Sequence, residues 1–268
     1  MDFVNIRRDR DAVTVVEMND PARYNALTTG LVGDLKEAFA SLRDDRETRV
    51  IVLAATGKGF CSGANMTGND VPLETANGRG PVGFIQMAQE NLAELILAIH
   101  EARQPVIAAV HGGAVGGGFA VSLACDLRVA SDEAFFAAHF IRVGLSSCDV
   151  GTSYLLPRIV GPTVAAELML TGRRFSAAEA MRIGLLNRVV ARDQLLAEAI
   201  DLGAMITANS EYGVYMTKIG MWANLDASSF RSAIQLENRT QVLGCFTGNM
   251  AEAGRAFVEK REPIWNPM

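Results

Sequence analysis

The sequence predicts an α/β fold whose core repeats short strands and helices. Apolar runs typical of buried strands, such as residues 50–54 and 106–110, each lead into a turn of small residues. Apolar residues at helical spacing follow the second of these turns. From about Asp193 onward only helical spacing remains. We therefore expect a core of repeated β-β-α turns over residues 1–195 and a helical oligomerisation region over residues 196–268.

The composition is that of an ordinary globular protein and excludes several functional classes. Of the 268 residues, 49% are hydrophobic and 21% are charged, with a net charge of −5. The acidic balance argues against nucleic acid as the main partner, and no apolar run is long enough for a membrane span. The N-terminus does not read as a secretory signal. Four cysteines without zinc-type spacing and three scattered histidines predict reduced thiols, no metal centre and a cytoplasmic location.

The first part of the chain is expected to form a hairpin, a helix and a buried strand. Residues 13–18 alternate enough to form a strand, which would pair with another near residues 3–7. Thr28 or Thr29 can cap a helix whose apolar residues recur at helical spacing. The strand at residues 50–54 follows this helix.

A polar stretch with many glycine, asparagine and threonine residues interrupts this order at residues 65–81. Its length predicts a loop that is either a lid over a site or a disordered surface segment. The next helix, roughly residues 84–101, carries apolar residues on one face and ends before Pro105.

Several shorter elements are expected beyond residue 110. They are strands at residues 126–130 and 134–137, a loop at residues 144–152, and a helix that begins near Ser153. Ser176 and Glu179 match a capping box at the start of a later helix. Near Met216 and Trp222 the C-terminal helices are rich in apolar residues, which predicts contacts between subunits.

The glycine-rich turn after residue 110 is the strongest candidate for a site. A strand leads into Gly116, Gly117 and Gly118, where a helix begins. Free backbone N–H groups and the positive end of the helix dipole come together there, and the glycines leave that backbone open to a ligand. The turn can grip an anion, or an oxygen that becomes anionic during a reaction. Close packing between the helix and the strand is the alternative explanation.

A second turn of small residues strengthens the prediction of an anion-binding site at the glycine-rich turn. The strand at residues 50–54 leads into Gly57-Lys-Gly-Phe-Cys-Ser-Gly-Ala64, which can also expose amides. Together with N-x-P-x-x-x-N-A-L at residues 19–27 and P-V-I-A-A-V-x-G-x-x-x-G-G-G at residues 105–118, it resembles the enoyl-CoA hydratase/isomerase (crotonase) family. The resemblance implies a spiral of repeated β-β-α turns, homotrimers that often pair as hexamers, and acyl-CoA substrates. Coenzyme A would then be part of the substrate, with no permanently bound cofactor.

The resemblance also assigns roles to individual residues. It implies that the amides of Ala64 and Gly117 bind the thioester oxygen. Residues implied to lie along coenzyme A are Arg23, Tyr24, Ala26, Ser62, Asn65, Met66 and Gly113, with Phe257 and Lys260 at the adenine end, from a neighbouring subunit. A solvated surface residue is the alternative for Lys260.

The acid/base positions are where the chain departs from the hydratase pattern. The two family glutamates correspond to Ala120 and Phe140, so direct hydration by a carboxylate pair is not expected. Asp149 resembles an aspartate of dienoyl-CoA isomerases and of 4-chlorobenzoyl-CoA dehalogenase, but the dehalogenase histidine corresponds to Ala93. We therefore favour isomerisation, with Asp149 as the proton-transfer residue. An N-cap role is its alternative.

Other assignments stay open at this point. His139 neighbours the second lost glutamate and could serve as the acid or base, or simply be packed. A non-catalytic acyl-CoA-binding protein would also lack the glutamates. A serine hydrolase that uses Ser62 is disfavoured, because the G-x-S-x-G elbow is absent.

Overall fold

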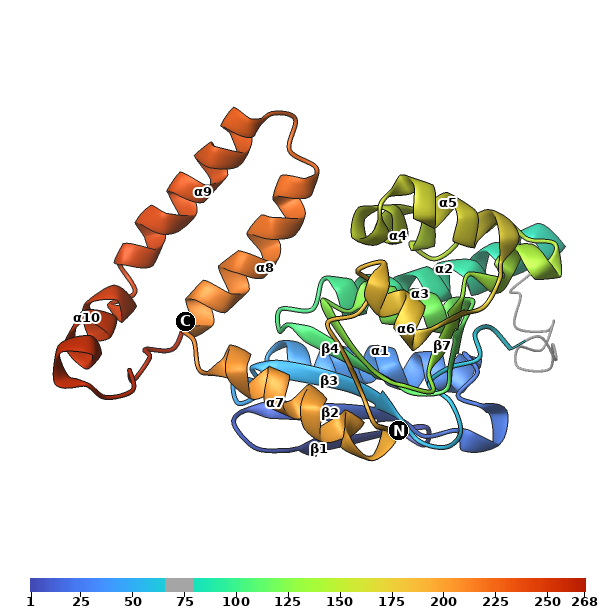
Figure 1. Cartoon of the computed structure of the whole chain (residues 1–268), viewed down its shortest axis with the longest axis horizontal. Helices are drawn as coiled ribbons and strands as arrows, with labels where there is room; N and C mark the ends of the chain where they lie inside the picture. Colours follow the sequence, from blue (N-terminus) through green and yellow to red (C-terminus); the bar gives the residue numbers. More distant parts are fainter. Residues whose placement is uncertain (66–79) are drawn as a thin grey trace.

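The structure, a computed structural model, describes residues 1–65 and 80–268 and is built around a six-stranded sheet (Figure 1). The strands lie in the order β1-β2-β3-β4-β6-β9, and only β1 and β2 pair in antiparallel fashion. Their bounds are Val4–Arg8, Val13–Met18, Val50–Ala55, Val106–Val110, Leu127–Ser131 and Arg188–Val190. The predicted hairpin and the predicted central strands are therefore present.

A second, three-stranded sheet gives the core its spiral character. It consists of β5 (Gly113–Val115), β7 (Phe135–Ala137) and β8 (Phe175–Ser176). The chain leaves β4 in the first sheet, turns at Gly112 with φ of +51°, and enters β5 in the second sheet before α3 begins. The same step joins β6 to β7. This β-β-α repeat confirms the predicted fold class.

Helices cover both faces of the large sheet. On one face lie α1 (Thr29–Arg43), α2 (Pro81–His100) and α3 (Gly117–Ala124). Thr28 caps α1 by accepting the Leu31 N–H, as predicted. The α2 helix begins at Pro81, three residues before the predicted start, because proline suits the first helical position.

The other face of the sheet is covered by α7 (Leu195–Thr207). Leu195, Ala199 and Ile200 pack against valines of β2 and β3 in a separate apolar cluster. Although only helices follow residue 193, the first of them therefore belongs to the packing of the core.

Three short helices complete the core. They are α4 (Thr152–Val160), α5 (Pro162–Thr171) and α6 (Ala177–Arg182). Pro157 lies inside α4, beyond its first turn. Ser176 accepts the Glu179 N–H as predicted, but the Glu179 carboxylate binds Arg173, so the structure shows one half of the expected capping box.

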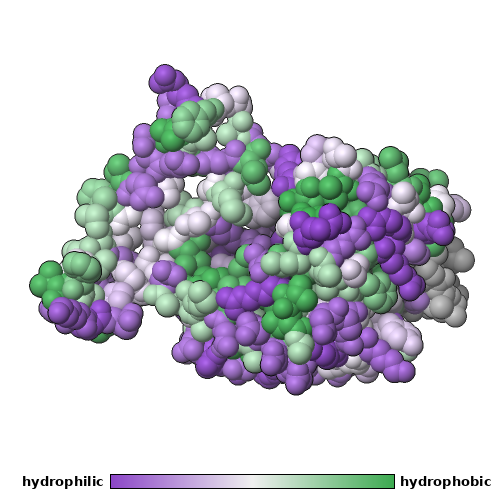
Figure 2. All heavy atoms as spheres, viewed as in Figure 1, coloured by the Kyte–Doolittle hydropathy of each residue, from purple (hydrophilic) through white to green (hydrophobic). Residues whose placement is uncertain are grey.

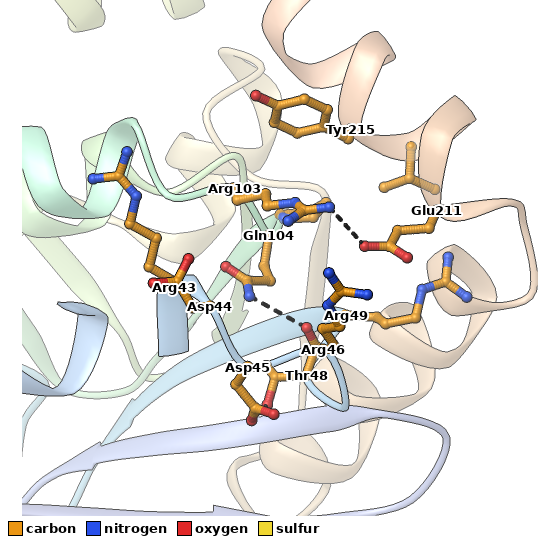
Figure 3. Close-up of a pocket in the computed structure, with 12 residues that line it drawn as sticks. Arg43, Asp44, Asp45, Arg46, Thr48, Arg49, Arg103, Gln104, Glu211 and Tyr215 are labelled. Atoms are coloured by element: carbon orange, nitrogen blue, oxygen red, sulfur yellow. Dashed lines mark hydrogen bonds and ion pairs between the residues drawn. The ribbon is translucent and has the colours of Figure 1, made fainter. Parts of the chain in front are cut away.

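The last three helices form an arm that stands away from the core (Figures 1 and 2). We call α8 (Glu211–Leu225), α9 (Phe230–Cys245) and α10 (Asn249–Glu259) the C-terminal arm. Its base is tied to the core by charged groups: Arg103 pairs with Glu211 at 3.0 Å (Figure 3), and Arg49 donates to the carbonyl of Asn209, just before α8. Within residues 1–65 and 80–268, no helix is both long and apolar enough to cross a lipid bilayer.

Candidate active site

The two turns singled out in the sequence lie directly against each other. Cys61 and Ala114 pair as in a parallel β-bridge between backbones. The Cys61 N–H donates to the Gly113 carbonyl at 3.0 Å, and the Cys61 carbonyl accepts the Val115 N–H at 3.0 Å. Backbone hydrogen bonds thereby join the turn after β3 to β5, immediately before the glycine triplet. Sequence spacing alone could not show this contact, because it joins residues more than fifty positions apart.

The amides of Ala64 and Gly117 come close together as a result. A Cβ built on Gly117 would lie 3.5 Å from the Ala64 nitrogen, and one built on Gly63 would lie 3.1 Å from the Gly117 nitrogen. Gly117 is the first residue of α3, where an N–H has no partner within the helix. Neither amide donates to another backbone group in the part of the chain that is described. Two backbone donors are thus available at one place.

Asn25 holds the N-terminal turn against this pair. It is fully buried; its Oδ1 accepts the Asp20 N–H, and its Nδ2 donates to the carbonyls of Thr56 and Gly59. The Leu27 N–H then donates to the Gly63 carbonyl at 2.8 Å. Asn25 was not among the predicted site residues, although it is the second asparagine of N-x-P-x-x-x-N-A-L.

The residues expected along coenzyme A fall into two groups. Arg23, Tyr24 and Ser62 lie together: the Ser62 N–H donates to the Tyr24 carbonyl at 3.1 Å, and all three are exposed. Ala26 is buried beside them, and Asn65 lies in the same turn as Ala64. Met66 and the predicted loop up to residue 79 lie outside the described residues.

The other expected contacts lie elsewhere. Gly113 is part of β5, and a side chain there would meet the Phe135 ring at 2.8 Å, so close packing accounts for this glycine. Phe257 and Lys260 belong to α10 and its C-cap, at the opposite end of the molecule from α2 (Figure 1). Within one chain they do not approach the paired amides.

An apolar cavity of about 600 Å³ opens beside Ala64, between α1 and α2. Its apolar lining residues include Leu27, Val32, Phe84, Met87 and Leu92. Two carboxylates, Glu90 and Glu94, also line it, and Glu94 pairs with Lys36 of α1. The cavity has the size and lining of a site for an acyl chain.

Apolar groups occupy the two positions that the sequence comparison above matched to the glutamates of hydratases. Ala120 is fully buried in α3, and Phe140 is buried with its ring edge 3.9 Å from a Cβ built on Gly116. Phe140 therefore lies next to the glycine triplet. Its neighbour His139 binds the Gly172 carbonyl through Nδ1 at 2.9 Å, which gives that imidazole a packing role.

Asp149 lies half-buried in the loop before α4. Gln89 of α2 donates to its Oδ1 through Nε2, and the Asp149 carbonyl accepts the Thr152 N–H at 2.8 Å. The N-cap residue of α4 is Gly151, with no side-chain capping bond. The Asp149 carboxylate is thus not used as a helix cap.

The groups that a hydrolase would need are not arranged for hydrolysis. Burial raises the pKa of the Cys61 thiol to about 12, so this thiol stays protonated and is a poor nucleophile. Ser62 lacks an adjacent histidine in the described chain: His111 binds the Gly57 carbonyl, His139 the Gly172 carbonyl, and the His100 ring packs on Trp222. A serine hydroxyl without a neighbouring base is a weak nucleophile.

Comparison with known proteins supports a single family. The profile of the enoyl-CoA hydratase/isomerase family matches residues 8–267. A Mycobacterium bovis protein named probable enoyl-CoA hydratase is 39% identical over 98% of this chain and 92% of its own length. The mevalonyl-coenzyme A hydratase of Aspergillus fumigatus is 32% identical over 95% of this chain and 92% of its own. A crystal structure of a probable enoyl-CoA hydratase/isomerase from Mycobacterium abscessus superposes with a TM-score of 0.91 at 38% identity, covering 98% of both chains.

Proposed function

Since this chain belongs to the enoyl-CoA hydratase/isomerase family and is an enzyme of that type, we propose that it moves a double bond within an acyl-CoA thioester. In this reaction the amides of Ala64 and Gly117 would bind the thioester oxygen, and Asp149 would transfer the proton. The observation that carries it is the close approach of these two amides beside an apolar cavity that Ala64 lines.

The paired amides suit a reaction that builds negative charge on a carbonyl oxygen. Removing a proton from the carbon next to a thioester carbonyl pushes electrons onto that oxygen and forms an enolate. Fixed backbone donors at that point lower the barrier, and losing one such donor typically costs about 3–4 kcal/mol. Because both donors are backbone groups, their strength does not depend on a side chain.

The proposed proton transfer balances without water. The Asp149 carboxylate takes a proton from the carbon between the carbonyl and a β,γ double bond. The resulting dienolate is held by Ala64 and Gly117, and the same proton returns to the γ carbon. The double bond ends in conjugation with the carbonyl, and the carboxylate is regenerated.

Isomerisation is favoured over direct hydration because of what surrounds the glycine triplet. Hydration by the usual route needs two carboxylates, one to activate water and one to protonate the substrate. The corresponding positions hold Ala120 and Phe140, and neither can transfer a proton. An atypical hydration that uses Asp149 is the second candidate, since the relatives compared above are named hydratases.

A panel of saturated, α,β-unsaturated and β,γ-unsaturated acyl-CoA thioesters would test this proposal. Isomerisation leaves the mass unchanged and creates a conjugated chromophore, whereas hydration adds the mass of water. Binding of every thioester without turnover of any would instead support a non-catalytic acyl-CoA-binding protein. Covalent labelling of Ser62 by a serine-directed reagent would support a hydrolase.

The first prediction concerns Asp149→Asn. The amide keeps the shape of the side chain but cannot accept a proton, so turnover of the best substrate should fall by roughly 10²-fold or more. Because no capping bond is lost, the unfolding temperature should stay at the parent value. Parent-like turnover would refute the catalytic role, and Glu94, which lines the cavity, would be the next residue to test.

A further inference from the structure

The backbone directly after Asp149 adopts a conformation that its residues disfavour. Val150 has φ of +36° and Gly151 has φ of +80°, so the chain is left-handed for two residues before α4. Glycine adopts this conformation readily, but a β-branched residue does not. Strained residues persist only where the surrounding structure enforces them, and they concentrate at functional sites.

Packing from α2 holds the backbone in this strained conformation. A Cβ built on Gly151 would lie 3.4 Å from Cγ2 of Ile96, so α2 packs directly on the strained turn. Val150 itself packs, half-buried, against the main apolar core. The turn is therefore fixed from two sides, and Asp149 is fixed with it.

Gln89 lies on the same stripe of α2 as Ile96. The two residues are seven positions apart, which is two helical turns, so both face the loop before α4. From this position Gln89 Nε2 donates to Oδ1 of Asp149. One carboxylate oxygen thus accepts a hydrogen bond from a neutral donor.

We propose that Gln89 is a positioning residue that sets the orientation of the Asp149 carboxylate, with the strained Val150 turn holding the backbone beneath it. The proposal rests on the catalytic role given to Asp149 above. A carboxylate at the end of a half-buried loop can rotate about its side-chain bonds. The Gln89 amide selects one rotamer, and the enforced turn fixes the backbone from which the Asp149 side chain extends.

Gln89→Leu is the decisive variant, assayed with a hexenoyl-CoA whose double bond is β,γ to the carbonyl. It removes the donor and keeps a side chain of similar volume. Gln89 is exposed, so stability should not change, whereas kcat should fall about tenfold or more, with KM nearly unchanged. Gln86→Leu is the matched control, because Gln86 donates to Glu90 at 2.8 Å on the same helix and does not contact Asp149.

A double-mutant cycle separates positioning from a general effect on the site. If Gln89 acts through Asp149, adding Gln89→Leu to Asp149→Asn should lower kcat by less than twofold. An equal loss in both backgrounds would overturn the proposal. If Asp149→Asn alone keeps the parent rate, or the parent transfers no proton, the proposed catalytic role fails first and this inference fails with it. If Asp149→Asn is slow but Gln89→Leu is as fast as the parent, only this inference fails.

Val150→Gly tests the turn without touching either polar group. Glycine allows the loop to sample both signs of φ, so the orientation of the Asp149 carboxylate should vary more. We therefore expect kcat to fall severalfold at unchanged KM. Ala12→Gly is its control, because Ala12 has φ of +61° in the hairpin turn between β1 and β2. Equal rates for parent and Val150→Gly would show that the turn does not position the carboxylate.

Discussion

Three adjacent glycines at the start of α3 are required for three different reasons. Gly116 has φ of +54° and ψ of −119°, a conformation that side chains disfavour. Gly118 lies so close to the turn after β3 that a Cβ would be 2.2 Å from the Cys61 carbonyl oxygen. Gly117 faces the Ala64 nitrogen, and its closest neighbour is the flexible end of Leu27. Only the middle glycine is therefore free of a structural requirement from the backbone.

Gly117→Ala should separate function from folding. Its methyl group would lie about where a thioester oxygen meets the Ala64 amide, so turnover should drop by roughly 10²-fold. The unfolding temperature should change little, because Leu27 can move aside. Gly118→Ala is the contrasting variant, since it collides with backbone and should lose stability. Parent-like kinetics in Gly117→Ala would argue against the role of the two amides.

The residue scale also marks the limit of what the sequence could predict. Each amide turn was predictable from its own pattern of small residues, whereas the pairing of the two turns was implied only by the family resemblance. The roles of Asn25 and Gln89 were not, because each depends on partners brought close by packing: the Thr56 and Gly59 carbonyls for Asn25, and Asp149 for Gln89. A polar side chain carries no signal for a distant partner.

At the scale of elements, the long helices, the central strands and the short strand β7 were predicted from the sequence, whereas three other short strands were not. The expected strands at residues 13–18 and 50–54 match β2 and β3 closely. The strands β5, β8 and β9 contain only two or three residues and show no alternation. Their pairing partners fix them: β5 and β8 both pair with β7, and β9 pairs with β6.

A buried ion pair attaches the C-terminal arm to the core. Lys218 of α8 lies 2.8 Å from Asp126 Oδ2 and donates to the Gln104 carbonyl at 3.0 Å. The two charged side chains are only 6% and 11% exposed, so either charge would be left without its counterion if the other were removed. Asp126 also accepts the Val106 N–H at the start of β4. The arm is thereby anchored at the edge of the central sheet.

Lys218→Met should destabilise the protein by about 3 kcal/mol, because it leaves the Asp126 carboxylate buried and unpaired. Lys36→Met is the control: Lys36 pairs with the exposed Glu94, and losing that pair should cost about 1 kcal/mol or less. Urea unfolding of both variants would measure the difference. Similar losses in the two would mean that burial adds nothing to the pair at Asp126.

Among the groups that hold the C-terminal tail is the Glu252 carboxylate, whose charge depends on pH. Glu252 accepts hydrogen bonds from Arg261, the Ile264 N–H and Arg255, which lower its pKa from 4.5 to about 2. Because the folded-state pKa is depressed, the stabilisation is complete above pH 4.5 and is lost as the pH falls toward 2. Trp265 reports on the tail, since its indole donates to the Ala208 carbonyl.

In a Trp222→Phe background, Trp265 fluorescence should therefore change as the pH falls from about 4.5 toward 2, when the tail detaches. Glu252→Gln should remove this transition, because the amide does not titrate. A transition of the same size and midpoint in Glu252→Gln would assign it to another carboxylate.

At the scale of the whole molecule, the arm is incompletely buried in a single chain. Lys218 is the one buried residue of α8 in the described chain, while Ile219, Met221 and Leu225 are exposed. None of the residues of α9, all of which are described, is buried; Val242 and Leu243 on this helix and Phe246 at its C-cap are exposed. Isolated helices of this length are marginally stable in water, so the apolar faces of α8 and α9 need further contacts.

We therefore expect the protein to be a homo-oligomer whose subunits cover these faces for one another. The family resemblance implies that this oligomer is a trimer or a pair of trimers. Light scattering at micromolar concentration should give a multiple of the 28.7 kDa chain mass. Replacing Val242 and Phe246 together by glutamate should shift the mass toward the monomer, because charges would have to be buried in the interface. Leu170→Glu is the control, since Leu170 is 75% exposed on α5, away from the arm. A parent protein that scatters as a monomer would contradict the expectation and would leave Phe257 and Lys260 without a neighbouring site to reach.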